Sequence, residues 1–383
     1  MKISIITMQN VPNYGSVLQA YATQVFFESM GLDVEFIDYW RINMLDEENV
    51  RRAVYVDCNM RYQRYWGKSK VFKALVYRIL LSKRIRRNSE FRKFVNENLH
   101  ISSKRYIGYD SLRNDYPNAD IYCTGGDQVW NSGWNEGIDK AFYLEFLPSD
   151  ARRISFSSSI GKEKIDKYEM EKIKDYLNKY ELITVRENSA MDIMESMKIN
   201  AIQVLDPVFM ISKEQWMKLI DSERKFQNDD YILVYQLNDN DEFYEYLKVL
   251  SKELHKKIIY IKYTKCKMIE GAICIEMPDV RTFLNLFFHA KYVITDSFHA
   301  TSFSIIFEKK FQCIFPKKYN TRIRSVLELF SLENRIVSDG PSDAVNMKKE
   351  IDYCSVNNSL DTLRNTQKRI FSKIVYKNKK GDE

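Results

Sequence analysis

The chain of 383 residues lacks the features that mark several classes of protein. Its six cysteines form no CxxC pair and no cluster with histidine, which argues against a disulfide framework and against structural zinc. No apolar run approaches the ~20 residues that a membrane-spanning helix needs. The GxGxxG, GxSxG, P-loop and HExxH motifs are absent, so dinucleotide, hydrolase, NTPase and zinc-enzyme functions lose most of their support. We therefore expect a cytoplasmic protein that uses no metal and no cofactor.

Basic residues are concentrated in one segment. The formal net charge is +7, yet the stretch from Arg61 to Lys93 carries twelve basic residues against Glu90 alone. A basic amphipathic helix, predicted within Val71 to Leu99, suits the surface of an anionic membrane, and a solvated helical excursion is the alternative. Nucleic acid is a weaker option, because no recognised binding motif accompanies the charge.

Strands alternate with helices along both halves of the chain. The stretches Lys2 to Thr7, Val17 to Met30 and Leu32 to Asp38 predict a strand, a helix and a second strand, which begin a Rossmann-like sheet. The clearest strand of the second half is Tyr231 to Leu237, and the same alternation follows it. We expect an α/β protein in which two Rossmann-like domains with parallel sheets face each other across a cleft.

The domain boundary is predicted near Ile211. The N-terminal domain then covers residues 1–211 and contains the basic helical excursion at 61–99, while the C-terminal domain covers residues 212–354. Residues 355–383 are expected to form a helix that crosses back to the N-terminal domain, followed by a disordered tail. A length of 383 residues exceeds that of a single typical domain and favours this division.

Polar side chains follow the carboxyl ends of predicted strands, where an open α/β sheet binds its ligands. His299 follows the strand Tyr292 to Thr295, Asp127 follows a strand that ends in two glycines, and Arg186 follows a third strand. An imidazole can donate a proton, a carboxylate can hold sugar hydroxyls or act as a base, and a guanidinium fits phosphate or carboxylate. Each residue also has a structural alternative: a capping or hole-filling histidine, a turn-capping aspartate, and an arginine paired with Glu187 or another acid.

Four basic residues crowd a further strand end, after the predicted strand Gln312 to Phe315. They are Lys317, Lys318, Arg322 and Arg324. An acid–base group surrounded by cations implies an anionic donor, and a single carboxylate implies a neutral polyol acceptor. Ordinary solvated surface charge is the alternative for at least some of the four.

Six stretches of the chain resemble the motifs of the polysaccharide pyruvyl transferase family and come in that family's order. They are NYGSVLQAYATQ (13–24), GGDQVWN (125–131), VRENSA (185–190), VLDP (204–207), DSFHATSFSIIF (296–307) and NTRIRSVLELFSLENRI (320–336). The resemblance implies a fold like that of the two-domain GT-B glycosyltransferases. It also implies transfer of pyruvate from phosphoenolpyruvate to two hydroxyls of a sugar, with a cyclic ketal and phosphate as products, in exopolysaccharide or capsule biosynthesis.

The resemblance assigns roles at the donor side. His299 is expected to protonate the methylene carbon of phosphoenolpyruvate, which is a co-substrate, and Arg186 is expected to bind this donor. A basic residue beyond the histidine contributes in the family, and Lys318 is our choice for it, with Lys317 close behind.

One position departs from part of the family. Members of the RLH type carry an arginine where this chain has Ser297, and Arg322 is the candidate replacement for its charge. Asp127 is expected to orient or deprotonate an acceptor hydroxyl. The residues expected to bind the acceptor come from the same motifs: Asn13, Tyr14, Gln128, Asn131 and Ser297.

The expected partners follow from these roles. The acceptor is expected to be an oligosaccharide or a lipid-linked sugar, and residues 61–93 are the candidate contact with anionic lipid at the inner face of the cell membrane. No nucleic acid is expected, and the oligomeric state is left open. Two other functions remain: a GT-B-like glycosyltransferase that uses a sugar nucleotide, which needs no phosphoenolpyruvate, and a non-catalytic sugar-binding relative, which releases no phosphate.

Overall fold

The computed structural model describes residues 1–56, 69–220, 230–238, 240–262, 269–315, 321–338 and 340–376. Two parallel five-stranded sheets dominate these ranges, one in each half of the chain. Across the first sheet the strands are β3 (Ile101–Ile107), β2 (Asp33–Trp40), β1 (Lys2–Ile6), β4 (Ile121–Thr124) and β5 (Arg153–Ser155). Across the second they are β10 (Ile273–Glu276), β9 (Lys257–Lys262), β8 (Tyr231–Gln236), β11 (Tyr292–Thr295) and β12 (Lys310–Cys313).

Both sheets have the same strand order, 3-2-1-4-5 counted along each half, which is the order of the Rossmann fold. A short parallel pair, β6 (Thr184–Val185) and β7 (Ile202–Gln203), lies beside the first sheet. All six residues of β8 are buried, as expected for a central parallel strand that is covered on both faces. The prediction of an α/β fold with two parallel sheets is therefore confirmed.

Helices connect the strands and cover the sheets. In the first half they are α1 (Tyr14–Glu28), α2 (Asp46–Arg51), α4 (Lys70–Asn98), α5 (Gly108–Asn114), α6 (Lys167–Leu177), α7 (Asn188–Ser196), α8 (Pro207–Met210) and α9 (Lys213–Met217). In the second they are α10 (Asp241–Leu254), α11 (Val280–His289), α12 (Phe298–Ile306), α13 (Thr321–Leu329) and α14 (Tyr353–Val375). Short 3-10 or π turns lie at Ile42–Met44, Arg52–Val56, Lys140–Tyr143, Glu333–Arg335 and Gly340–Lys348.

Two local expectations need correction. Strand β3 lies at the edge of its sheet and has the sequence ISSKRYI, in which polar residues stand between apolar ends. It therefore lacks the apolar run that marks the central strands, and the sequence pattern missed it. Helix α1 begins at Tyr14, earlier than the predicted Val17, because Asn13 accepts hydrogen bonds from its first backbone amides, and Ser297 caps α12 in the same way, so that this helix begins at Phe298. His299 therefore lies in the first turn of a helix and not in the loop before it.

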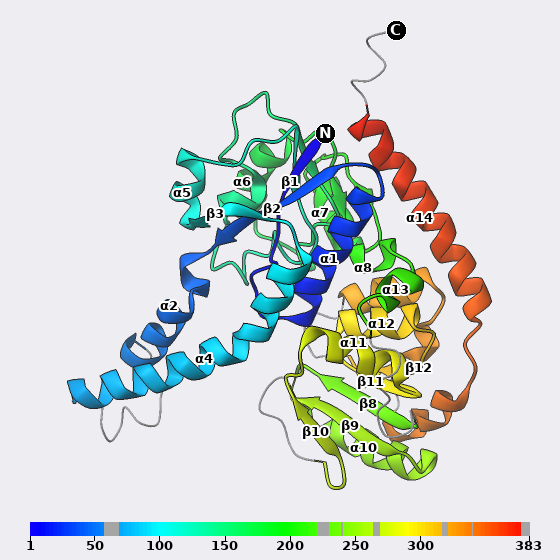
Figure 1. Cartoon of the computed structure of the whole chain (residues 1–383). Coiled ribbons are helices and arrows are strands. Elements are labelled where there is room, and N and C mark those ends of the chain that lie inside the picture. Colours follow the sequence, from blue (N-terminus) through cyan, green and yellow to red (C-terminus); the bar gives the residue numbers. More distant parts are fainter. Residues whose placement is uncertain are drawn as a thin grey trace.

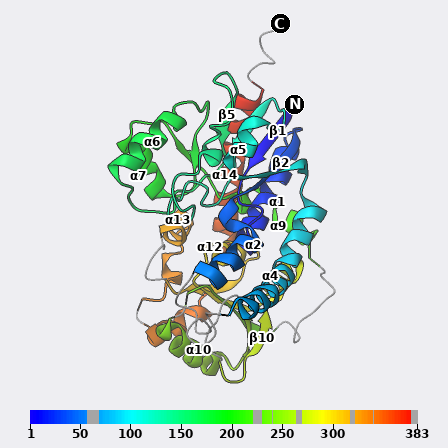
Figure 2. The same ribbon diagram turned by 90° about the vertical axis from the view of Figure 1, so that its left-hand side faces the viewer.

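Helices α1, α12 and α13 lie between the two sheets in both views (Figures 1 and 2), and α8 lies beside them in Figure 1. One hydrophobic cluster runs through this layer from the first sheet to the second. At its centre the ring of Tyr14 stacks on Phe283 with centroids 4.0 Å apart, and the Tyr14 hydroxyl donates to the carbonyl of Pro278 at 2.5 Å. The two halves are thus packed together through apolar side chains and not only through the site between them.

Helix α14 runs along the outside of both halves (Figure 1). At its beginning, the Tyr353 hydroxyl donates to the carbonyl of Lys309 in the second half. Near its end, Phe371 is fully buried against Phe26 and Phe156 of the first half. Within the described part of the chain, no helix is both long and apolar enough to cross a membrane.

Phe371→Ala is expected to lower the free energy of unfolding by about 3–5 kcal/mol, because it leaves a cavity between three phenylalanine rings. Urea denaturation measures the change. Lys373→Ala, an exposed position of the same helix, is the matched control and should change the free energy by less than about 0.5 kcal/mol. Equal losses in the two variants would contradict the anchoring of α14 through Phe371.

Candidate active site

Asp127 and His299 occupy equivalent places in the two halves. Asp127 follows β4 and His299 follows β11, and each of these strands is the fourth in its sheet and pairs with the first. The strand order reverses between the first and the fourth strand, and open α/β sheets bind ligands outside the carboxyl ends at that point. The two switch points of the molecule therefore carry a carboxylate and an imidazole.

Helices α1 and α12 bring the two switch points together, because they begin in contact. A Cβ atom built on Gly15 would lie only 2.0 Å from Nδ1 of His299, so only glycine fits there. Asn13 caps α1 by accepting from the amide of Gly15 at 2.8 Å, and Ser297 caps α12 by accepting from the amide of Ala300 at 3.5 Å. The positive ends of two helices therefore point at one region, which favours anions there.

Arg186 lies at the centre of a buried charged cluster. Its Nη1 donates to Asp206, its Nη2 is 3.8 Å from Oδ1 of Asp127, and its Nε is 3.8 Å from Oε2 of Glu187. Burial alone would lower its pKa, but the three carboxylates outweigh burial and raise the pKa of Arg186. Nε and Nη2 are buried and have no hydrogen-bond partner, so the N–H groups of these two atoms are available to a ligand.

His299 is next to Asp206 but is not bonded to it. Its Nε2 lies 3.8 Å from Oδ2 of Asp206, is buried, and has no hydrogen-bond partner. Burial lowers the pKa of the imidazole to about 4, because the charge of Arg186 adds to the cost of protonation and the carboxylates of Asp206 and Asp127 only partly offset it. His299 is therefore neutral near pH 7.

Asp127 is ionised although it is buried. Burial raises its pKa, but the charge of Arg186 and a hydrogen bond from Ser16 outweigh burial, and the net pKa is lowered. Oγ of Ser16 donates to Oδ2 at 2.5 Å, and the amide of Gln128 donates to Oδ1 at 2.9 Å. Its backbone has a φ of 70°, a left-handed conformation that aspartate tolerates better than most residues. A carboxylate held in this way can accept a proton or a hydroxyl.

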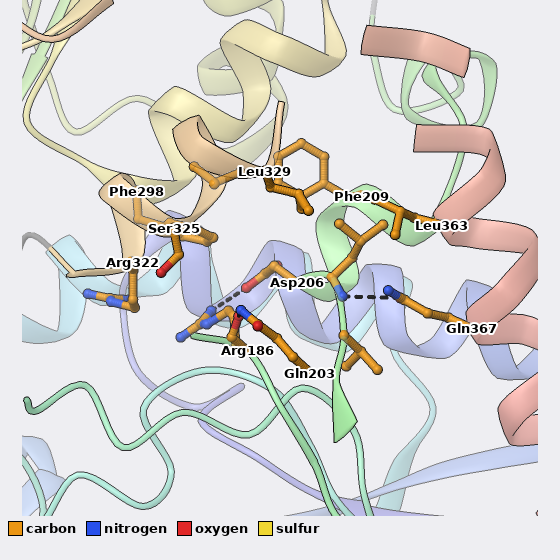
Figure 3. A pocket seen from close by; sticks show the side chains of 13 residues that line it. Arg186, Gln203, Asp206, Phe209, Phe298, Arg322, Ser325, Leu329, Leu363 and Gln367 are labelled. Atoms are coloured by element: carbon orange, nitrogen blue, oxygen red, sulfur yellow. Dashed lines mark hydrogen bonds and ion pairs between the residues drawn. The ribbon is translucent and has the colours of Figure 1, made fainter. Parts of the chain in front are cut away.

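A cavity of about 120 Å³ lies beside this cluster, between the two halves (Figure 3). Residues that line it include Arg186, Asp206, Phe298, Arg322, Leu363 and Gln367. A volume of this size admits several waters or a small anion. His299 does not line the cavity itself, but Asp206, its neighbour, does.

Arg322 adds a second cation to the cavity. Its guanidinium lies over the ring of Phe298 at 5.6 Å, and that of Arg186 lies over the same ring at 5.0 Å. Burial and the charge of Arg186 lower the pKa of Arg322 to about 10, which leaves it charged near pH 7. Across the described ranges, Arg322 makes no ion pair, so its charge is not neutralised by a contacting carboxylate.

The structure brings His299, Asp127, Arg186 and Arg322 together. Of the residues expected to bind the acceptor, Asn13 and Ser297 are the two helix caps, and Tyr14 packs between the halves. Nδ2 of Asn131 donates to Oε1 of Gln128 at 2.6 Å on the loop after Asp127. Their acceptor role stays a prediction.

Lys317 and Lys318 lie outside the described residues. Among the described residues, no cluster of His, Cys, Asp and Glu is arranged to hold a metal ion.

Asp206 is the site residue that has no role in the expectations from the sequence. It caps α8 by accepting from the amide of Val208 at 3.0 Å, and its other oxygen faces both Arg186 and His299. An aspartate directly before a proline at a helix start is a local capping signal, and this signal was available in the sequence. The residues around Asp206 in the sequence give no sign of its contact with Arg186, twenty residues away.

The lowered pKa of His299 makes stability depend on pH. As the pH falls below 6.5, the ordinary pKa of histidine, His299 becomes protonated in the unfolded chain but stays neutral in the folded chain down to about pH 4. The free energy of unfolding therefore falls over this range. At about pH 5 the wild-type protein should have lost roughly 2 kcal/mol more than His299→Gln, relative to about pH 7. Urea denaturation at the two pH values measures this, with the exposed His100→Gln as control. Parallel pH profiles for wild type and His299→Gln would rule the shift out.

Gly15→Ala is expected to destabilise the fold by about 1–3 kcal/mol, because the added methyl group overlaps the imidazole of His299. The same change in an ordinary helix stabilises it by roughly 0.5–1 kcal/mol, so the sign of the effect is the test. Urea denaturation gives the sign, and the NMR signals of the His299 ring report its displacement. A stabilised variant with an undisturbed ring would contradict the contact between α1 and α12.

Comparison with known proteins agrees with this geometry. No curated protein matches the chain. Similar solved structures include UDP-GlcNAc 2-epimerase from Methanocaldococcus jannaschii in complex with UDP-GlcNAc and UDP, with 15% identity, 95% of this chain and 99% of that chain covered, and a TM-score of 0.50. Another UDP-N-acetylglucosamine 2-epimerase has 10% identity, 100% and 97% coverage and a TM-score of 0.54. UGT89C1 of Arabidopsis thaliana, complexed with UDP-L-rhamnose, has 8% identity, 97% and 98% coverage and a TM-score of 0.51.

These likenesses establish the fold alone, which is the two-domain GT-B arrangement that was expected. The sequence model of one family, polysaccharide pyruvyl transferase, matches residues 13–314 and so includes Asp127, Arg186 and His299. Since that match spans most of its length, the chain belongs to the polysaccharide pyruvyl transferase family.

Proposed function

We propose that the protein transfers pyruvate from phosphoenolpyruvate onto two hydroxyls of a sugar, forming a cyclic ketal and releasing phosphate. One observation carries the proposal: Nε and Nη2 of Arg186 and Nε2 of His299 are buried without hydrogen-bond partners, next to the unneutralised charge of Arg322. Buried donors of this kind are normally satisfied, so a missing partner is the simplest account of them. An anion that carries both a carboxylate and a phosphate would satisfy several at once.

The donor anion competes with Asp206 for Arg186 in this proposal. Nη1 of Arg186 donates to Asp206, and His299 is neutral near pH 7. An anion on Arg186 frees Asp206 to accept a hydrogen bond from Nε2 of His299, which is 3.8 Å away. The freed carboxylate and the bound anion both favour the imidazolium, so donor binding raises the pKa of His299 and supplies the acid.

The charged imidazole then protonates C3 of the donor, which becomes a methyl group and leaves C2 electron-deficient. A sugar hydroxyl attacks C2 and loses its proton, a step that we assign to the ionised Asp127. A second hydroxyl of the same sugar attacks C2 as the C2–O bond to phosphate breaks, and its proton leaves with the phosphate. Arg186 and Arg322 stabilise the negative charge of the departing phosphate.

The donor anion needs more positive charge than these two arginines supply. The described cluster contains the carboxylates of Asp127, Glu187 and Asp206 and only two guanidinium groups, which is an excess of one negative charge. The segment just before α13, the helix that carries Arg322, contains Lys317 and Lys318. We assign these lysines to the donor anion as well.

The acceptor in this proposal is an oligosaccharide or a lipid-linked sugar of exopolysaccharide or capsule biosynthesis. Asn13, Tyr14, Gln128, Asn131 and Ser297 remain its proposed contacts. The helix N-termini capped by Asn13 and Ser297 begin next to His299 and Asp127, which supports an acceptor bound across both halves. We place the protein in the cytoplasm, at the inner face of the cell membrane.

Release of inorganic phosphate from phosphoenolpyruvate, measured against a panel of free and lipid-linked sugars, tests the proposal. His299→Gln is expected to lower the rate by about 10²–10⁴ while donor affinity, measured by calorimetry, stays nearly unchanged. Arg322→Gln should instead weaken donor binding, because it removes a positive charge that lines the cavity. The exposed His100→Ala is the matched control and should keep full activity.

Three outcomes would overturn the proposal. Wild-type turnover by His299→Gln would remove the acid from the mechanism. Transfer of a sugar from a UDP-sugar without phosphoenolpyruvate would establish a glycosyltransferase instead, and binding of sugars with no phosphate released under any pairing would establish a non-catalytic protein.

A further inference from the structure

Helix α4 (Lys70–Asn98) extends away from the rest of the molecule. It has 29 residues, and its fully buried ones, Asn88, Phe91, Phe94 and Val95, all lie in its second half. Its first half projects beyond the sheets together with α2, at the lower left of Figure 1. A helix that buries no side chain over several turns gains little from tertiary packing there, so its exposed face needs another explanation.

The two faces of this projecting half differ. On the inner face, Nε of Arg84 and Nδ2 of Asn88 donate to Oδ1 of Asp46 on α2, at 2.9 and 2.8 Å. On the outer face, Val71, Leu75 and Ile79 are 82%, 56% and 47% exposed. Their spacing of four residues places them in one row along the helix. An apolar row on a face turned away from the molecule marks an interaction surface.

Positive charge surrounds the apolar row. Helix α4 contains nine basic and two acidic residues, so its net charge of +7 equals the formal net charge of the whole chain. Arg84 and Arg92 pair with Asp46 on the inner face. Exposed basic residues of the helix include Lys70, Arg78, Lys83, Arg86 and Lys93. Arg86 follows Ile79 by seven residues and so continues the apolar row with a cation.

We infer that the outer face of α4 docks on an anionic lipid bilayer, with Val71, Leu75 and Ile79 inserted at the level of the headgroups and the basic residues on anionic lipid. An apolar row flanked by lysine and arginine is the pattern of a helix that lies in a membrane interface. The charge itself disfavours pairing with the same helix of a second copy, since two helices of net charge +7 repel each other. Nucleic acid would use the charge but leave the apolar row in water. The inference does not depend on the proposed reaction, because docking needs neither donor nor acceptor.

Co-sedimentation of the full chain with vesicles tests the inference. The protein is expected to sediment with vesicles that contain phosphatidylglycerol and to stay in solution with pure phosphatidylcholine, and high salt should weaken but not abolish binding, since the apolar row is insensitive to screening. Leu75→Asp and Arg86→Glu are each expected to reduce the fraction bound about tenfold at low lipid concentration. The controls are Val345→Asp, a 61% exposed apolar position of the second half, and Arg113→Glu, an exposed basic position on α5.

Circular dichroism and thermal melting, with wild-type behaviour expected for all four variants, establish that each is folded. Equal sedimentation with both kinds of vesicle, or none with either, would overturn the inference. So would a loss of binding that is the same in Val345→Asp as in Leu75→Asp. A shift from dimer to monomer in Leu75→Asp, measured by light scattering without any change in vesicle binding, would make the outer face of α4 an interface between copies of the chain.

Discussion

The ion pair between Arg186 and Asp206 is the interaction on which the arrangement of the site depends. It joins Arg186, which follows β6, to Asp206, which comes shortly after β7, and both side chains are almost completely buried. Breaking a buried pair by removing one partner is costly, since the other charge is left without compensation. Two further nitrogen atoms of Arg186 have no hydrogen-bond partner, so an anion bound to them can compensate the charge of Arg186 in place of a carboxylate.

Burial has a large effect on the protonation of His299. An imidazole near two carboxylates would ordinarily be expected to gain a proton, yet desolvation and Arg186 keep His299 neutral. The same environment keeps Asp127 ionised, because the charge of Arg186 and a hydrogen bond from Ser16 favour the charged form. Near pH 7 both groups therefore lack their proton, His299 as a neutral imidazole and Asp127 as a carboxylate. The acid role proposed for His299 thus requires its pKa to rise when the donor binds.

Much of this arrangement is readable in the sequence, and the exceptions have physical reasons. The central strands β8 and β11 are apolar runs, and the residues that follow the strands of one parallel sheet gather at one edge, so the place of Asp127 and of His299, each at the edge of its own sheet, is predicted without coordinates. The edge strand β3 is half exposed and carries no such run. The close approach of Gly15 to His299 and the pairing of Arg186 with Asp206 arise from packing between distant segments, and local residue patterns do not encode such packing.

Helix α14 limits how the two halves can separate. Tyr353 joins it to the second half, while Phe371 and Arg364 join it to the first, where Arg364 donates to the carbonyls of Phe209 and Ile211. A rotation that widens the space around Asp127 must therefore pivot about this helix. The entrance then opens most on the side farthest from α14, so this one C-terminal helix limits the size of the molecule that can reach the buried carboxylate.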